Sequence, residues 1–328
     1  MNNNRRTVLA SALAASITAA VPLSAFAQKK IVVGFSQIGA ESEWRTANTN
    51  SMKSAAAAAG IELKFSDAQQ KQENQIKALR SFIAQKVDVI ALTPVVESGW
   101  DTVLKEIKDA KIPLILMDRS VDSKDTSLYA THIGFDFVKQ GEMAGQWLAD
   151  RAKTMKGDIN VVELQGTVGS SPAINRKQGF EEALEGHANL SLIRSQTGDF
   201  TRSKGKEVME GFLKAEDGGK NICAVYAHND DMAVGAIQAI KDAGLKPGTD
   251  IKVLSIDAVP DIFAAMVTGE ANATVELTPN MAGPAFEALD AYLSAGTMPE
   301  KFIITESKLY TPADDPQGEY DRRKGLGY

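Results

Sequence analysis

The segment IPLILMDR, residues 112–119, decides the fold, because a similar sequence pattern is repeated as IKVLSIDA at residues 251–258. Each is a short apolar run that ends on an aspartate, as expected of a strand buried on both faces of a parallel sheet. Three more pairs of apolar runs repeat along the chain: Ile31–Ser36 with Ile159–Leu164, Ile61–Phe65 with Leu190–Arg194, and Val87–Thr93 with Ile222–Ala227. The paired runs start 128, 129, 135 and 139 residues apart. This nearly constant offset predicts an α/β protein of two similar, doubly wound parallel-sheet (Rossmann-like) lobes.

Longer amphipathic segments fill the gaps between these runs and predict helices on both faces of each sheet. The best defined cover residues 44–59, 72–85 and 230–243. Gly60 and Gly244 follow the first and third, where a glycine commonly ends a helix.

The chain has 328 residues and a net charge of −6, which allows two domains of ordinary size. An acidic protein is a poor partner for nucleic acid or an anionic membrane surface. Its single cysteine, Cys223, lies in an apolar run and is expected to be a small buried hydrophobe.

Residues 1–27 predict a cleaved signal peptide. Arg5 and Arg6 precede an apolar stretch at residues 8–20, and Ala25-Phe26-Ala27 has the pattern of a cleavage site. The apolar stretch is shorter than the ~20 residues of a membrane-spanning helix, so we expect no membrane insertion after its removal and a periplasmic location. Twin-arginine and ordinary secretory export both fit the two arginines.

Polar side chains follow the predicted strands, at the sheet edge where parallel sheets bind ligands. Sugar recognition needs carboxylate acceptors, amide or guanidinium donors and an aromatic face. The candidate ligand-binding residues supply all of these: Gln37, Glu41, Trp44, Arg45, Asp118, Arg119, Arg176, Phe200, Asn229 and Asp257. Three carboxylates balance three arginines in this set, which favours a neutral ligand. Taken one at a time, each residue also fits a purely structural role, as a member of a surface ion pair, a core aromatic or a helix cap.

Several of these segments resemble the ribose/galactose-type substrate-binding proteins over essentially the whole mature chain. The resemblance rests on Asp118-Arg119 after an apolar run, on the segment HNDDM at 228–232, and on SIDAVPD at 255–261. It implies a type I periplasmic binding protein, in which Asp118, Arg119, Asn229 and Asp257 bind sugar hydroxyls. Arg176 and Phe200 match further ligand positions of the family.

The family topology implies lobes that cross in sequence and are joined by a hinge. We expect an N-terminal lobe of residues 29–133 plus 278–302 and a C-terminal lobe of 134–277 plus 303–328. A ligand that bridges the two lobes is expected to close them.

Longer blocks, among them ESEWR at 41–45 and GDFTRSKGKEVME at 198–210, look like the galactofuranose-binding members of this family. That likeness implies a monosaccharide ligand, galactofuranose first, delivered by a monomer to the permease of an ABC-type importer without any cofactor. Glu43-Trp44 replaces a pair of aromatics, and Glu276-Leu277 stands where a glutamine is usual. Both departures argue against a simple ribose or glucose ligand.

Other functions remain alternatives. Another pentose or hexose is the first. A glycoside hydrolase would use Asp118 and Asp257 as paired carboxylates, although the cation beside Asp118 favours its charged form and therefore binding. An effector domain of a LacI-type transcription factor would need a DNA-binding segment where the signal peptide stands. A metal site is not expected, because His132, His187 and His228 show no ligand spacing.

Overall fold

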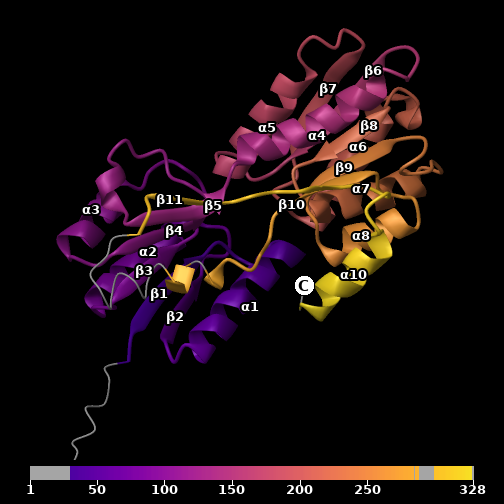
Figure 1. Cartoon of the computed structure of the whole chain (residues 1–328). Coiled ribbons are helices and arrows are strands. Elements are labelled where there is room, and N and C mark those ends of the chain that lie inside the picture. Colours follow the sequence, from indigo (N-terminus) through magenta and orange to yellow (C-terminus); the bar gives the residue numbers. More distant parts are fainter. Residues whose placement is uncertain (1–29, 284, 288–298, 327–328) are drawn as a thin grey trace, which may run out of the picture. The chain divides into compact units, whose positions relative to one another are not determined.

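The computed structural model describes residues 30–283, 285–287 and 299–326. The predicted signal peptide lies outside these residues. The described chain forms two six-stranded sheets, each with helices packed on it (Figure 1). This confirms the predicted two-lobed α/β fold.

The first sheet has the strand order β11-β5-β4-β3-β1-β2, and all of its neighbouring strands are parallel. Its strands are β1 (Val32–Gln37), β2 (Glu62–Asp67), β3 (Val89–Leu92), β4 (Leu114–Asp118), β5 (Thr131–Phe135) and β11 (Phe302–Thr305). The helices that follow its first three strands are α1 (Glu43–Ala58), α2 (Gln72–Ala84) and α3 (Asp101–Asp109).

The second sheet repeats this plan in the order β12-β10-β9-β8-β6-β7. Only the pairing of β10 with β12 is antiparallel among its described strands. Its strands are β6 (Ile159–Gln165), β7 (Leu190–Thr197), β8 (Ala224–Ala227), β9 (Lys252–Asp257), β10 (Ala273–Glu276) and β12 (Leu309–Tyr310). Its helices are α4 (Phe137–Ala152), α5 (Ser171–Leu184), α6 (Arg202–Ala215), α7 (Asp230–Asp242), α8 (Pro260–Val267) and α10 (Pro316–Gly325).

The chain passes three times between the sheets: after β5, after β10 and after β11. Two predicted boundaries need correction. Gly134 pairs with Asp118 and Phe135 pairs with Thr305, so residues 134–135 and 303–305 belong to the first sheet. The chain leaves a sheet only after the last paired residue of a strand. The family topology predicts the position of that residue only approximately. The rest of the division stays a proposal.

Alternate residues of the central strands face opposite layers, as a sheet covered on both faces requires. In β8, Ala224 and Tyr226 pack with residues of α4, whereas Val225 and Ala227 pack with residues of α6 and α7. Both layers are apolar, so the continuous hydrophobic run is what holds this strand at the centre of its sheet. No helix of the described chain is long and apolar enough to cross a membrane.

Candidate functional site

The carboxyl ends of the strands carry unusual backbone. Asp118 ends β4 at a φ of 60°, and Asp257 ends β9 at a φ of 125°. Phe200, in the turn after β7, has a φ of 61°. Positive φ is costly for residues with a side chain and recurs at functional sites.

Nine of the ten candidate residues line one cavity of about 280 Å³ of empty space. Its complete lining is Glu41, Ser42, Trp44, Arg45, Asp118, Arg119, Pro172, Arg176, Phe200, Asn229, Asp257 and Leu277. The first lobe supplies residues from the β1–α1 segment and the end of β4, and the second supplies the ends of β7, β8 and β9 with the start of α5. The fold therefore brings together nine residues that the sequence pattern predicts to be neighbours.

Arg45 links two acids within this cavity. Its Nε lies 3.0 Å from Oε1 of Glu41, and its Nη2 lies 2.7 Å from Oδ2 of Asp118. Burial acts to lower the pKa of Arg45, but the two carboxylates outweigh it and raise that pKa. The Ser42 side chain caps α1 by accepting from the backbone N–H of Arg45 at 3.1 Å, which fixes where this helix starts.

Arg119 is held by its Nη1, which donates to the Val95 carbonyl at 2.8 Å. Its guanidinium lies 5.1 Å from the centroid of the Phe200 ring. Burial and the nearby charge of Arg45 lower the pKa of Arg119 to about 10, so it remains cationic at neutral pH. The Phe200 ring fits because residue 166 is glycine: a Cβ there would lie 1.9 Å from the ring.

Arg176 approaches from the second lobe on α5. Its Nε donates to Oε1 of Gln140 at 3.0 Å and its Nη1 donates to the His228 carbonyl at 2.5 Å. Its Nη2 lies 3.8 Å from Oδ1 of Asp257, beyond hydrogen-bond reach. Burial lowers the pKa of Arg176 and raises that of Asp257 well above its ordinary value.

Asn229 and Trp44 are anchored through their polar atoms. Asn229 caps α7 by accepting from the Met232 N–H at 3.1 Å, and its amide nitrogen donates to the Phe200 carbonyl at 3.1 Å. One lone pair and one N–H of this amide are left for a ligand. The Trp44 indole N–H donates to the Leu277 carbonyl, so the ring face is fixed.

Four buried polar atoms of lining residues lack a hydrogen-bond partner among the described residues. They are Oε2 of Glu41, Nη1 of Arg45, Nε of Arg119 and Nη2 of Arg176. An unsatisfied buried polar group is costly, and each one calls for an explanation. Three donors and one acceptor are what a ligand rich in hydroxyl groups can satisfy.

Gln37 does not line this cavity, which corrects its place in the candidate set. Its Nε2 donates to Asn48 at 2.9 Å and to Thr49 at 3.2 Å, and its Oε1 accepts from the Ile38 N–H. The end of β1 is therefore bonded to its own lobe. Ser42, Pro172 and Leu277 were missed; Ser42 had a signal, because it stands before a helix.

A buried polar cluster lies behind Asn229. Nε2 of His228 lies 3.0 Å from Oε1 of Glu163, and Nδ1 accepts from the Gly166 N–H at 3.3 Å. The second oxygen of Glu163 accepts from Ser195, from Gln165 at 3.0 Å and from Lys177 at 3.2 Å. Burial acts to raise the pKa of Glu163, but these partners outweigh it and lower the pKa to about 2.

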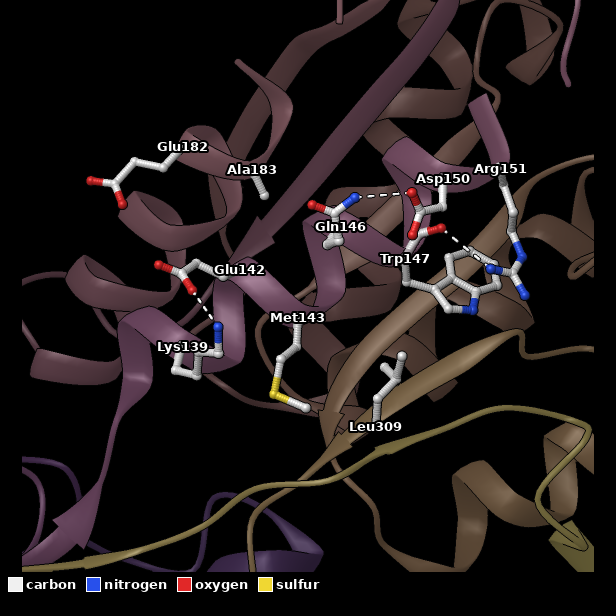
Figure 2. Close-up of a pocket in the computed structure, with 10 residues that line it drawn as sticks. All are labelled: Lys139, Glu142, Met143, Gln146, Trp147, Asp150, Arg151, Glu182, Ala183 and Leu309. Atoms are coloured by element: carbon white, nitrogen blue, oxygen red, sulfur yellow. Dashed lines mark hydrogen bonds and ion pairs between the residues drawn. The ribbon is translucent and has the colours of Figure 1, made fainter. Parts of the chain in front are cut away.

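A second hollow of about 910 Å³ of empty space lies on α4, α5 and β12 (Figure 2). Its polar side chains pair with one another: Lys139 with Glu142 at 2.9 Å, and Gln146 with Asp150 at 3.0 Å. The smaller cavity, with its unpartnered donors, is the better candidate site. In the described part of the chain no cluster of three or more His, Cys, Asp or Glu side chains could hold a metal ion.

Comparison with known proteins agrees with this geometry. The family described as periplasmic binding protein domain matches residues 33–297. The galactofuranose-binding protein YtfQ of Escherichia coli (strain K12) is 58% identical over 328 residues, 99% of each chain. The binding protein of the arabinose ABC transporter from Shewanella sp. ANA-3, bound to α- and β-L-arabinofuranose, is 53% identical with a TM-score of 0.86, covering 90% of this chain and 96% of that one.

A crystal structure from Mycobacterium smegmatis in complex with β-D-fucofuranose is 49% identical, with a TM-score of 0.86 and coverage of 90% and 96%. The family match covers residues 33–297, and the relative from Escherichia coli aligns over 99% of the chain. Both point to the same family. The chain belongs to the periplasmic binding protein family, among the sugar-binding proteins that serve ABC-type importers.

Proposed function

We propose that this protein captures a single neutral monosaccharide in its furanose form, galactofuranose first, for the permease of an ABC-type importer. The observation that carries the proposal is the set of four unpartnered polar atoms in the small cavity between Trp44 and Phe200. Three relatives that bind galactofuranose, arabinofuranose and fucofuranose support the five-membered ring. All ten sequence-predicted residues except Gln37 are proposed to take part.

The charges of the cavity support a neutral ligand. Glu41 and Asp118 lie within 3.0 Å of Arg45, and both also act on Arg119, so two carboxylates face two guanidinium groups and need no counter-charge from a ligand. Arg119 and Arg176 each donate to a backbone carbonyl, and both keep a free N–H for a ring or hydroxyl oxygen. A phosphate or carboxylate ligand would leave the two acids facing its negative charge.

Binding without chemistry is part of the proposal. A glycosidase needs a carboxyl group that can give its proton to the leaving group, with a second carboxylate opposite. Asp257 has the raised pKa of such an acid, but its counterpart Asp118 is bound to Arg45 at 2.7 Å. Incubation with nitrophenyl galactosides is expected to release no nitrophenol, and turnover would favour the hydrolase.

Isothermal titration of the mature protein against a panel of furanose and pyranose sugars tests the ligand. We expect galactofuranose to bind most tightly, with 1:1 stoichiometry and a monomer by light scattering. Methyl furanosides and methyl pyranosides of the same sugars separate ring form from configuration, because neither can change its ring. Preference for a pyranoside in every matched pair would overturn the furanose proposal.

A further inference from the structure

One of the polar contacts that join the two lobes outside the sugar cavity involves Glu43. The backbone N–H of Glu43, in the first turn of α1, donates to Oδ2 of Asp231 on α7 at 2.8 Å. A carboxylate at a helix N-terminus is favourable, because the N–H groups there carry partial positive charge. The hydrogen bond to Asp231 therefore holds the start of α1, including Glu43, next to the second lobe.

Four charged side chains of the second lobe affect the pKa of Glu43 at this contact. They are Asp231, Asp261 of α8, Arg202 of α6 and Lys324 of α10. Arg202 is already engaged, with its Nη2 3.0 Å from Asp231 and 2.8 Å from Asp261. Three acids thus share two cations. Oε2 of Glu43 is buried without a hydrogen-bond partner among the described residues.

This arrangement disfavours an ionised Glu43. Burial, with the charges of Asp261 and Asp231, raises the pKa of Glu43 to about 7, against the opposing effect of Arg202 and Lys324. All four of these groups lie on the other lobe's helices. If the lobes separate, the side chain regains water and loses both acids, and its pKa returns toward the ordinary value of 4.5.

We propose that Glu43 is a proton-binding site built between the lobes, so that closure around the sugar takes up a proton. The inference rests on the proposed function, since it needs lobes that open and close. Glu43 is not among the residues that line the sugar cavity, so the proton and the sugar are separate ligands of one closed state. Each then strengthens the binding of the other.

The sign of the effect follows from linkage. The closed state holds the proton more tightly, so closure is favoured at low pH, and this advantage is lost as pH rises through about 7. A pKa difference of one unit corresponds to a tenfold change. Because Glu43 is only partly buried, water screens the shift, and we expect about tenfold weaker sugar binding at pH 7.5 than at pH 5.

Titration calorimetry on the full mature protein tests this with the tightest-binding furanose of the panel. Runs near pH 6 in buffers of different ionisation enthalpy give the number of protons taken up per sugar. We expect net uptake by the parent, and Glu43→Gln should take up fewer protons and show a weaker pH dependence, while the buried carboxyl of Asp257 can supply the uptake that remains. Glu73→Gln removes an exposed first-turn glutamate from α2 and should keep both. Asp261→Asn should reduce the uptake partly, since it removes one repelling charge.

Equal proton uptake by the parent and Glu43→Gln would overturn the inference, and so would pH-independent binding by the parent. Either result leaves sugar capture itself intact. Small-angle scattering without sugar gives a reading that does not depend on the ligand: the parent should have a smaller radius of gyration at pH 5 than at pH 8, and Glu43→Gln should not. If no sugar binds but this difference is found, the proposed function fails and the proton site stands.

Discussion

Two buried carboxylates on the same sheet, Glu163 of β6 and Asp257 of β9, differ in their partners rather than in their burial. Glu163 has four side chains within reach of its two oxygens, and its pKa falls to about 2. Asp257 has Arg176 at 3.8 Å, and its pKa rises. Burial alone therefore does not mark a binding residue. A buried carboxylate whose oxygens are hydrogen-bonded by other side chains, such as Glu163, supports the structure. A buried carboxylate without such partners, such as Asp257, is available to a ligand.

Replacing Glu163 with alanine is expected to cause the largest effect, on folding. Removing one member of a buried ionic network costs about 3–5 kcal/mol, because His228 and Lys177 lose their acceptor. Urea unfolding of the sugar-free protein measures it. Glu163→Gln is the matched variant, since it keeps an acceptor for His228 and should lose less. A midpoint for Glu163→Ala equal to that of the parent would contradict the structural role.

The Glu163 cluster also sets the acid limit of this part of the fold. Its pKa is lowered from 4.5 to about 2, so its contribution to the free energy of unfolding is present above about pH 4.5 and is lost as pH falls toward 2. Urea midpoints at pH 3 and pH 6 should therefore fall more steeply with acid in the parent than in Glu163→Gln. Parallel pH profiles for the two proteins would show that this carboxylate is not perturbed.

Asp118→Ala is expected to act on binding rather than on the Glu163 cluster. It removes an acceptor at the cavity and leaves Arg45 with Glu41 alone. The loss of a hydrogen bond to a charged group costs about 1.5–3 kcal/mol, which is roughly a tenfold to hundredfold weaker Kd. Titration with the parent's best sugar decides the matter. Arg45→Lys is the variant to compare with it. Lysine keeps the positive charge but lacks the second nitrogen, Nη2, through which Arg45 holds Asp118.

Arg119→Lys is expected to weaken binding by about tenfold. An ammonium cannot hold the Val95 carbonyl, present a second N–H to the cavity and lie over Phe200 at once. The titration that measures Asp118→Ala also measures this variant. Affinity unchanged for every sugar bound by the parent, in both variants, would remove the Asp118-Arg119 pair from the site.

The sequence predicted the candidate site mainly through one rule, that polar residues after parallel strands gather at the sheet edge. Asp118, Asn229 and Asp257 do line one cavity, whereas the Gln37 side chain bonds to Asn48 and Thr49 of its own lobe, which the rule does not foresee. β5, β10, β11 and β12 were not predicted, because they are short and lie outside the four pairs of apolar runs that repeat along the chain. The contact of Glu43 with Asp231 joins residues 188 positions apart, and no local pattern encodes it.

Asp257→Asn is expected to have the smallest effect and tests the comparison most directly. Asparagine has nearly the same shape but cannot ionise. The raised pKa of Asp257 means that the parent loses stability as pH rises through that pKa, because a buried carboxylate must then be charged. Relative to the parent, Asp257→Asn should therefore be more stable at pH 8 than at pH 4. Its sugar affinity should fall less than that of Asp118→Ala, since the amide oxygen still accepts. Urea unfolding at the two pH values, with a sugar titration at pH 8, measures both expectations. A variant that loses stability relative to the parent as pH rises would mean that Arg176 already pairs with Asp257 as firmly as His228 pairs with Glu163, and the distinction between a satisfied and an available carboxylate would not hold for this sheet.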